Sequence, residues 1–278
     1  MTTTWFITGT SSGFGRLLTE RLLERGDRVA ATLRRPEALQ DLRERYGDLL
    51  WTARLDVTDA DEVERVVEDA FAALGTIDVV VNNAGYGVFA SAEEASDEQI
   101  RRVVDTNLLG SIRVVRAALP RLRAQGHGRI LQISTAGGQA TYPNFSYYHA
   151  SKWGIEGFSE TVAQEIAPFG IGLTIVEPGA TPTGFGSSLD TAPVMAEYDA
   201  TPAGDVRRAI ASGEFGLPND PERIAGAIVD LVDSGETPLR LPLGSDTYEH
   251  VRAALVARLA EHESHREVAY SVVAPASR

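Results

Sequence analysis

The chain has 278 residues, of which 43% are hydrophobic and 23% charged, values typical of a folded soluble protein. Its formal net charge of −13 argues against a general binder of nucleic acid or of an anionic membrane. It contains no cysteine, which excludes disulfides, thiolate chemistry and Cys-based metal sites. No run approaches the roughly 18 apolar residues of a membrane span, and the N-terminus lacks a signal-peptide pattern, so we expect a cytoplasmic protein.

Short apolar runs alternate along the chain with longer amphipathic segments. The runs of strand length lie at 5–8, 28–33, 49–55, 78–82, 129–134, 172–177 and 238–244. The helix-like segments lie at about 14–25, 36–45, 59–74, 97–124, 146–168, 220–234 and 246–262. This alternation predicts an α/β fold with a doubly wound, Rossmann-type parallel sheet of about seven strands and helices on both faces. The prolines of the last run favour the edge of the sheet, and Thr58 or Asp59 is the expected N-cap of the third helix.

A glycine-rich turn, "TGTSSGFGR", follows the first predicted strand and opens the next helix. Glycines at this place allow a tight turn and let the backbone approach a pyrophosphate. Their spacing differs from the common G-x-G-x-x-G fingerprint, but the position after strand one predicts a dinucleotide site. The residues predicted to contact the cofactor here are Gly9, Ser11, Ser12, Gly13, Phe14 and Gly15.

The second predicted strand ends in "ATLRRPE". Sites for NAD often carry an Asp or Glu at this end to bind the ribose hydroxyls, but here Leu33 is followed by Arg34 and Arg35. A carboxylate would repel a 2′-phosphate, whereas a guanidinium group binds it through two hydrogen bonds. The sequence therefore favours NADP(H) over NAD(H), with Arg34 as the phosphate ligand and Arg35 as a solvated side chain.

Six short motifs occur in order between residue 4 and about residue 183. They are "TGTSSGFG" (8–15), "LDVT" (55–58), "NNAG" (82–85), "TNLLG" (106–110), "YHASK" (148–152) and "PGATPT" (178–183). In this order and spacing the chain resembles the short-chain dehydrogenase/reductase family. The resemblance implies hydride transfer between a nicotinamide and a carbonyl or alcohol carbon, with proton transfer by a tyrosine.

The resemblance also implies roles for further residues. Asn107 is expected to hold a helix kink and a water of the proton relay. Family members commonly form dimers or tetramers through the helices predicted at 97–124 and 146–168, so we expect a homodimer or homotetramer. The remaining cofactor contacts that it implies are Asp56, Val57, Asn83, Ala84, Gly85, Tyr148, Lys152, Pro178, Gly179, Thr181 and Thr183.

Two adjacent tyrosines compete for the role of acid/base. An unperturbed phenol has a pKa near 10, and a fixed ammonium group nearby favours its ionised form. Tyr148 lies four residues before Lys152 and so shares its helix face, whereas Tyr147 is rotated by about 140° from the lysine. Tyr148 is therefore the predicted acid/base, and Tyr147 is expected to pack or to border the pocket.

Two adjacent alcohols compete for the assisting hydrogen bond to the substrate oxygen. The family's assisting serine usually lies thirteen residues before the tyrosine, and that count from Tyr148 reaches Thr135. Ser134 takes the role if the loop holds one extra residue. Neighbours on an extended strand point to opposite faces, so both cannot reach the substrate equally. We favour Thr135 and keep Ser134 as the alternative.

We expect residues 1–278 to form a single dinucleotide-binding catalytic domain, with a substrate lid, or a plain surface insertion, at about 179–219. Apolar residues of this segment either form a pocket for a hydrophobic substrate or anchor the lid; they are Phe185, Leu189, Val194, Met195, Tyr198 and Phe215. No metal site is assigned.

The sequence thus predicts an NADP(H)-dependent oxidoreductase that acts on a ketone, aldehyde or secondary alcohol and binds neither nucleic acid nor membrane. The alternatives are a non-catalytic NADP-sensing regulator on the same fold and an NAD-preferring alcohol dehydrogenase. Epimerase or dehydratase chemistry on a sugar nucleotide is less consistent with the glycine turn and with the short region after residue 183.

Overall fold

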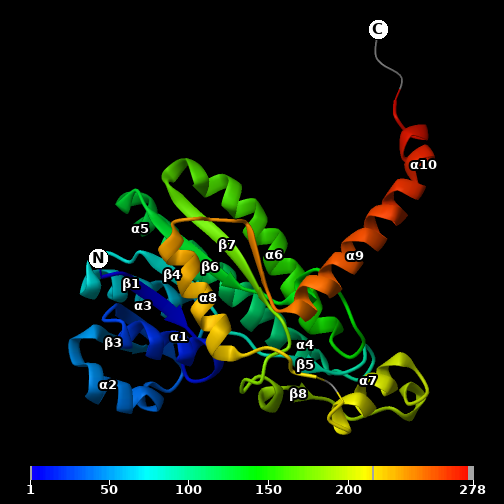
Figure 1. Ribbon diagram of the computed structural model, residues 1–278, viewed down its shortest axis with the longest axis horizontal. Helices are drawn as coiled ribbons and strands as arrows, with labels where there is room; N and C mark the ends of the chain where they lie inside the picture. The colour runs from blue at the N-terminus through cyan, green and yellow to red at the C-terminus, as the bar shows by residue number, and fades with distance from the viewer. Residues whose placement is uncertain (1, 215, 275–278) are drawn as a thin grey trace.

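The computed structural model describes residues 2–214 and 216–274. Seven parallel strands form one central sheet in the order β3-β2-β1-β4-β6-β7-β9, which confirms the predicted doubly wound fold (Figure 1). The strand expected at the sheet edge, β9, lies there. The strands are β1 (Thr4–Thr8), β2 (Arg28–Leu33), β3 (Leu50–Arg54), β4 (Val79–Asn82), β6 (Gly128–Ile133), β7 (Ile171–Pro178) and β9 (Arg240–Leu243).

Side chains alternate between the two faces of the sheet, and each face has its own core. Phe6 of β1 packs with Val63, Val114 and Val162 from the helices on one face. Ile7, the next residue, packs on the opposite face. The helices that supply these cores are α3 (Ala60–Leu74), α5 (Ser111–Gln125) and α6 (Ser146–Ile166) on the first face, and α1 (Gly13–Glu24), α2 (Gln40–Tyr46) and α8 (Pro221–Ser234) on the second.

Local signals account for several helix boundaries. The Asp59 side chain accepts a 2.9 Å hydrogen bond from the backbone of Glu62, so Asp59, not Thr58, caps α3. The helix predicted at 97–124 consists of α4 (Asp97–Val104), a π-helical turn (Asp105–Gly110) and α5. π-Turns inside helices are frequent at functional sites, and this one contains Asn107.

The segment at 179–219 has secondary structure of its own. It contains β8 (Asp190–Thr191), which pairs with β5 (Val88–Phe89), and α7 (Pro202–Ala211). Thr201 caps α7 and Pro202 occupies its first turn. Strands of two residues carry no readable periodicity, which explains why β5 and β8 were not predicted.

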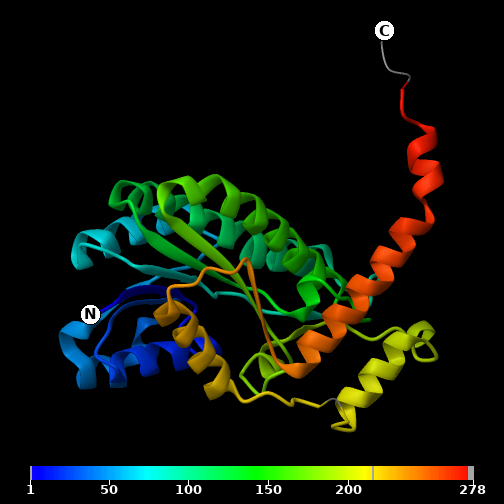
Figure 2. The same cartoon turned by 45° about the horizontal axis from the view of Figure 1, so that its top comes forward.

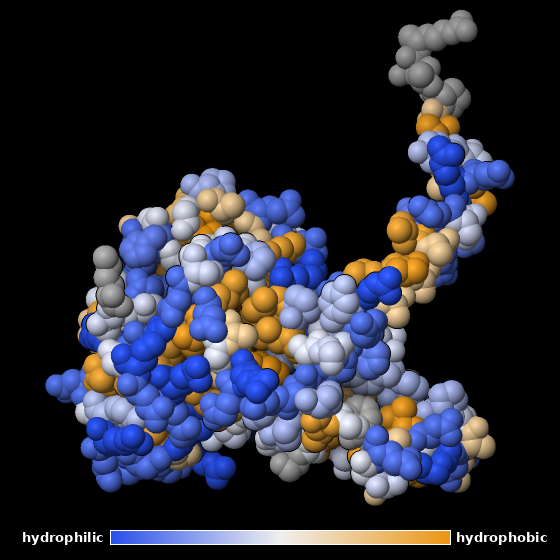
Figure 3. Space-filling model, in the orientation of Figure 1, coloured by the Kyte–Doolittle hydropathy of each residue, from blue (hydrophilic) through white to orange (hydrophobic). Residues whose placement is uncertain are grey.

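The C-terminal helices α9 (Ser245–Ser264) and α10 (Arg266–Ser271) extend away from the sheet (Figures 1 and 2). The first turns of α9 contact the body, where Thr247 and Val251 are buried. Beyond them apolar side chains such as Leu255 and Leu259 are exposed along the projecting helix (Figure 3). Within the part of the chain that the structure describes, no helix has the length and apolar character needed to span a membrane.

Candidate active site

A cavity of about 1630 Å³ opens at the carboxyl ends of the sheet strands. Thr8, Leu33, Asn83, Ser134 and Pro178, which end or directly follow five different strands, all line it. Ligands of doubly wound folds bind at this edge of the sheet, and sites for small ligands typically measure about 300–1,000 Å³. The cavity is therefore large enough for a dinucleotide and a second, smaller molecule.

The glycine turn forms one end of the cavity. Gly9 and Gly13 have φ of +71° and +56°, a conformation that favours glycine. A Cβ on Gly15 would lie 2.4 Å from the Gly9 carbonyl oxygen, so Gly15 permits close packing of the turn and does not line the cavity. Ser12 begins α1 without a side-chain cap, which leaves the first backbone N–H groups of the helix available for an anion. This end of the cavity fits a pyrophosphate.

Beside the glycine turn, Arg34 lines the cavity and Arg35 does not. Asp56 and Val57 line the same region. The Asp56 carboxylate accepts hydrogen bonds of 3.0 and 2.7 Å from the backbone N–H and the hydroxyl of Thr58. Burial acts to raise the pKa of Asp56, but the Thr58 hydrogen bonds and nearby arginines, Arg34 among them, outweigh it and lower this pKa. A carboxylate and a guanidinium group thus stand together where a ribose would bind.

The "NNAG" segment is tied to the glycine turn by side-chain hydrogen bonds. Asn83 Nδ2 donates to the carbonyl oxygens of Thr8 and Gly9, over 2.9 and 3.1 Å. The Thr8 hydroxyl in return accepts from the backbone N–H groups of Asn83 and Ala84, both over 3.0 Å. Asn83, Ala84 and Gly85 all line the cavity, so these contacts fix the floor on which a cofactor would lie.

Asn107 is buried in the π-turn, and its amide binds protein groups. Its Oδ1 accepts from the Tyr86 backbone N–H over 3.0 Å, and its Nδ2 donates to the Tyr86 carbonyl over 2.8 Å. Nδ2 also reaches Ser151 Oγ, 3.2 Å away on α6. Asn107 does not line the cavity. Its side chain joins the segment after β4 to the helix that carries Tyr148, a role that the sequence did not indicate.

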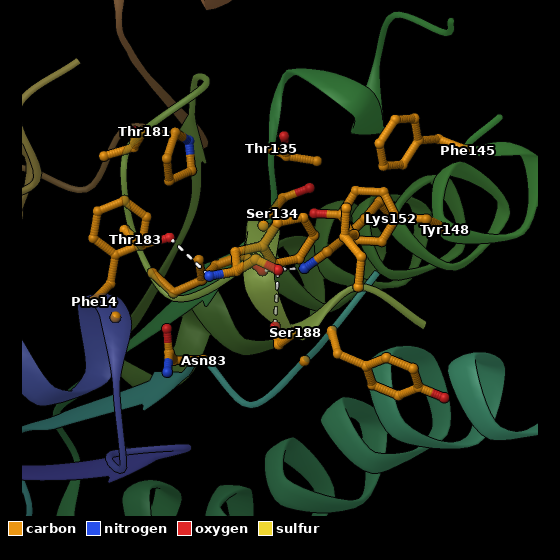
Figure 4. Close-up of a pocket in the computed structure, with 18 of the residues that line it drawn as sticks. Phe14, Asn83, Ser134, Thr135, Phe145, Tyr148, Lys152, Thr181, Thr183 and Ser188 are labelled. Atoms are coloured by element: carbon orange, nitrogen blue, oxygen red, sulfur yellow. Dashed lines mark hydrogen bonds between the residues drawn. The ribbon is translucent and has the colours of Figure 1, made fainter. Parts of the chain in front are cut away.

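Tyr148 and Lys152 lie one turn apart on α6, and both line the cavity. Figure 4 shows them with Ser134 and Thr135 on one side of the pocket, opposite Phe14, Asn83, Thr181 and Thr183. Lys152 Nζ is 5.7 Å from the Tyr148 ring centroid and donates to the Ile133 carbonyl over 3.0 Å. Tyr147 does not line the cavity; its hydroxyl donates to the Ala92 carbonyl instead.

Burial dominates the electrostatics of this pair. It raises the pKa of the Tyr148 phenol, and a hydrogen bond with Thr135 acts in the opposite direction. Burial also lowers the pKa of Lys152 to about 8, against a raising effect of Glu156. The sequence led us to expect the lysine as the main influence on the tyrosine, whereas desolvation is the larger effect. Tyr148 is accordingly protonated at neutral pH.

The two alcohols have different partners. Ser134 Oγ donates to Glu156 Oε1 over 2.6 Å. The Thr135 side chain is hydrogen-bonded to Tyr148, and its hydroxyl also accepts a long 3.4 Å hydrogen bond from Gly137. Both residues line the cavity, but only Thr135 has its hydroxyl next to the phenol.

The "PGATPT" segment forms the opposite wall, where Pro178, Gly179, Thr181 and Thr183 line the cavity. Asp246, at the start of α9, accepts a 2.7 Å hydrogen bond from the Ala180 backbone. A Cβ on Gly179 would lie 2.2 Å from an Asp246 carboxylate oxygen, so glycine is required at this approach. Asp246 was not predicted, since it lies 66 positions after Ala180 and the sequence does not show their contact.

Away from the glycine turn apolar side chains form part of the cavity wall, beside polar ones such as Gln139, Asp190 and His250. Phe185 and Leu189, both predicted, line it, whereas Val194, Met195 and Tyr198 do not; Phe215 lies outside the described residues. The sequence reasoning missed walls from three other places in the chain. These wall residues are Tyr142, Phe145, Val206, Ile210, Leu217, Ala253 and Ala254.

A buried ion pair, also missed, holds the 179–219 segment against the body. Arg207 of α7 pairs with Glu94, and the two side chains are 14% and 1% exposed. Arg207 also donates to Ser91 Oγ over 2.8 Å and to Asn144 Oδ1 over 3.2 Å. Asn144 Nδ2 donates to the Ala203 carbonyl over 2.8 Å, which ties α7 to the loop that enters α6. We call this pair the Arg207–Glu94 latch.

Comparison with known proteins identifies relatives of this arrangement. The family model described as short chain dehydrogenase matches residues 3–193. The chain is 38% identical over 270 residues to the oxidoreductase BOA17 of Botryotinia fuckeliana, covering 96% of this chain and 98% of that protein. It also resembles the crystal structure of a short-chain dehydrogenase from Streptomyces avermitilis, with 37% identity, a TM-score of 0.91, and coverage of 99% and 100% of the two chains.

More distant solved structures carry cofactors in their descriptions. An alcohol dehydrogenase from Thermococcus sibiricus is complexed with 5-hydroxy-NADP; it is 26% identical, with a TM-score of 0.72, and the match covers 87% of this chain and 96% of that one. A 3-ketoacyl-(acyl-carrier-protein) reductase from Brucella melitensis is complexed with NADH; it is 25% identical, with a TM-score of 0.72 and coverage of 86% and 96%. Solved structures similar to this chain thus include complexes with both NADP-type and NAD-type molecules.

Proposed function

The chain belongs to the short-chain dehydrogenase family of NAD(P)-dependent oxidoreductases, and from this premise we propose that it reduces a hydrophobic ketone or aldehyde with NADPH, Tyr148 being the proton donor. The observation that carries the proposal is that Thr135, Tyr148 and Lys152 together line the inner end of a cavity whose other end fits a pyrophosphate. When bound, NADPH supplies the hydride. The chain's own residues bind and orient the carbonyl and deliver the proton.

Each residue at the inner end has a task in this proposal. The hydroxyls of Thr135 and Tyr148 together bind the carbonyl oxygen, so that the proton of Tyr148 lies along the hydrogen bond to the atom on which negative charge develops. Lys152 orients the ribose and keeps a positive charge beside Tyr148 as that residue loses its proton. Desolvation strengthens these charge interactions, since Tyr148 and Lys152 are each only 6% exposed.

The choice of NADPH rests on Arg34. Its side chain lines the cavity near Asp56, and its charge lowers the pKa of that carboxyl group without a salt bridge between the two. A 2′-phosphate would supply the guanidinium group with a salt-bridge partner. Because Asp56 is also near and would repel a phosphate, the preference depends on which of the two charges lies closer to the ribose, and Arg34 is our assignment.

The substrate assignment rests on the apolar walls, among them Phe145, Phe185 and Leu189. We propose residues 179–219 as a lid over the substrate and residues 1–278 as one catalytic domain. The homodimer or homotetramer expected from the resemblance remains a prediction.

The test is a panel of ketones, aldehydes and secondary alcohols, followed by nicotinamide absorbance with NADPH and NADH in parallel. We expect turnover of bulky apolar carbonyls, faster with NADPH than with NADH. Tight NADPH binding without turnover of any compound would instead support a cofactor-sensing regulator. Faster turnover with NADH would refute the assignment of Arg34 and leave the reaction class intact.

A further inference from the structure

Two buried carboxyl groups lie behind the active site, and neither lines the cavity. Glu156 of α6 is 3% exposed and Glu177 of β7 is 1% exposed. Arg240 of β9 lies between them, with its Nε 3.3 Å from a carboxylate oxygen of each. Arg240 also pairs with Glu160 at 2.9 Å, so one guanidinium group faces three carboxyl groups.

Glu156 and Lys152 act on consecutive residues at the end of β6. Lys152 Nζ donates to the Ile133 carbonyl over 3.0 Å, and Glu156 accepts from Ser134 Oγ over 2.6 Å. Being four residues apart on α6, the lysine and the glutamate are neighbours on one helix face. A Cβ on Gly138 would lie 1.8 Å from Glu156 Oε1, so the carboxylate also packs directly on the turn that presents Thr135.

The contacts of the two glutamates differ in a way that locates the negative charge. Burial raises the pKa of Glu156, whereas the three groups around it, Ser134, Arg240 and Lys152, all favour its ionised form. Glu177 has Gln139, whose Nε2 donates over 2.6 Å, and its share of Arg240, but it also faces the charge of Glu156. Burial and then Glu156 raise the pKa of Glu177 to about 7. Of the two carboxyl groups, Glu156 therefore ionises first as the pH rises, and the proton that the pair retains lies on Glu177.

The negative charge of Glu156 favours the ammonium form of Lys152. Burial lowers the pKa of its ammonium group to about 8, and Glu156 is the one group that opposes the shift. The remaining charged groups of this cluster are Glu177, Glu160 and Arg240. Arg258 of α9 donates to the nearby Gln139 carbonyl over 2.6 Å.

We propose that Glu156 is a positioning residue of the reaction: its negative charge, kept there by Ser134, Arg240 and a proton on Glu177, holds Lys152 in the ammonium form. The inference rests on the proposed function only in giving that ammonium group a task beside Tyr148. Whether Glu156 controls the protonation of Lys152 is a separate, measurable question.

The sequence offers a direct measurement, because Lys152 is the only lysine in the chain. Protein labelled with ¹³C and ¹⁵N in lysine alone gives a single side-chain signal, whose pH titration reports the Lys152 pKa without reference to turnover. The variants are Glu156→Gln and, as a matched control of the same shape in the same cluster, Glu177→Gln. Glutamine imitates the protonated glutamic acid, so the control keeps the charge that the proposal assigns to Glu177.

We expect the Lys152 pKa to fall by about one unit or more in Glu156→Gln, the usual effect of an adjacent opposite charge, and to stay within a few tenths of a unit in Glu177→Gln. The alkaline limb of kcat/KM for carbonyl reduction should move to lower pH in step with the first variant alone. An unchanged Lys152 pKa in Glu156→Gln, or equal shifts in both variants, would overturn the proposal.

Should Glu156→Gln fail to fold, Ser134→Ala takes its place. This variant removes only the hydroxyl that stabilises the Glu156 anion, and we expect a smaller fall in the Lys152 pKa; no fall would count against the proposal. The experiment distinguishes failure of the inference about Glu156 from failure of the proposed function. If the protein reduces carbonyls but the Lys152 titration is unchanged in the variant, the inference is wrong and the proposed function stands. If the titration shifts but the protein reduces no carbonyl, the inference stands and the proposed function is wrong.

Discussion

Ser134 Oγ lies 2.6 Å from Glu156 Oε1, and the Ser134 hydroxyl donates its proton to that buried carboxylate. A hydroxyl group has one proton to donate, so Ser134 has none left for a substrate oxygen. Thr135, the next residue, is hydrogen-bonded to Tyr148 instead. Glu156 thus separates the roles of two alcohols that the sequence distinguishes only by a count of residues.

Replacing Thr135 by Val removes the hydroxyl and keeps the shape of the side chain. We expect kcat/KM to fall by about 10²-fold or more, the usual effect of losing one donor to a developing oxyanion, and Thr135→Ser to recover most of the loss. Ser134→Ala should cost less, because it acts only through Glu156. Steady-state kinetics of the three variants on one substrate measures this. A larger loss in Ser134→Ala than in Thr135→Val would reverse the assignment.

Tyr148→Phe removes the proposed proton donor. Since general acid catalysis contributes about 10²–10⁴-fold, we expect a loss of that size in kcat with NADPH binding retained. Tyr147→Phe is the matched control, because its hydroxyl donates to the Ala92 carbonyl outside the cavity. It should keep its activity and lose about 1 kcal/mol of unfolding free energy at most. Pre-steady-state turnover and denaturant melts separate the two effects, and equal losses of activity would contradict the assignment.

Arg34→Leu removes the proposed ligand of the 2′-phosphate. A hydrogen bond to a charged group contributes about 1.5–3 kcal/mol, so the ratio of kcat/KM for NADPH over NADH should fall about 10- to 100-fold. Arg35→Leu, the neighbouring residue that does not line the cavity, should leave this ratio unchanged. If Arg35→Leu lowers the ratio and Arg34→Leu does not, the two arginines have been assigned in the wrong order.

The features that the sequence predicted are those set by near neighbours in the chain. The seven strands follow from apolar runs, and the shared face of Tyr148 and Lys152 follows from helical spacing. The contacts that it missed join distant segments: Ser134 with Glu156 across 22 residues, and Arg207 with Glu94 across 113. From the sequence alone, charged residues such as Glu156, Arg207 and Glu94 are expected on the surface, because the contacts that bury them form only in the folded chain.

The missed helix α7 had a local signal, since Thr201 and Pro202 form a typical helix start. No local signal in the sequence indicated that α7 lies beside the cavity. The α7 residues Val206 and Ile210 line the cavity only because the Arg207–Glu94 latch holds the helix against the body. Residues of the segment predicted as a lid thus line the cavity through contacts that the sequence did not show, and its role as a lid stays a prediction.

Arg207→Met tests the latch. It leaves the Glu94 carboxylate buried without its cation, and breaking a buried pair in this way costs about 3 kcal/mol or more of unfolding free energy. We also expect KM to rise for bulky substrates, since α7 supplies part of the wall, and limited proteolysis within residues 179–219 to accelerate. Arg208→Met, which breaks an exposed pair with Asp205 and an exposed hydrogen bond to the Asp199 carbonyl, should cost under about 1 kcal/mol. Equal effects of Arg207→Met and Arg208→Met would contradict the proposed role of the Arg207–Glu94 latch.

The raised pKa of Glu177 predicts how the free energy of unfolding depends on pH. Burial and Glu156 raise its folded-state pKa to about 7, from an ordinary value of 4.5. The folded protein therefore binds this proton more tightly than the unfolded chain does. The resulting stabilisation is fully present below pH 4.5 and is lost as the pH rises to about 7.

Glu177→Gln removes this titration while imitating the protonated acid. Relative to the wild type, the variant should gain on the order of 2–3 kcal/mol of unfolding free energy between pH 4.5 and pH 8, as expected from 1.36 kcal/mol for each unit of pKa shift. His149 acts in the opposite sense, because burial lowers its pKa to about 4. Its contribution is common to both proteins and cancels in the difference. Urea melts of both proteins across this range measure the effect. A difference that stays constant with pH would mean that Glu177 is ionised throughout, and Arg240 would then have to balance two buried charges by itself.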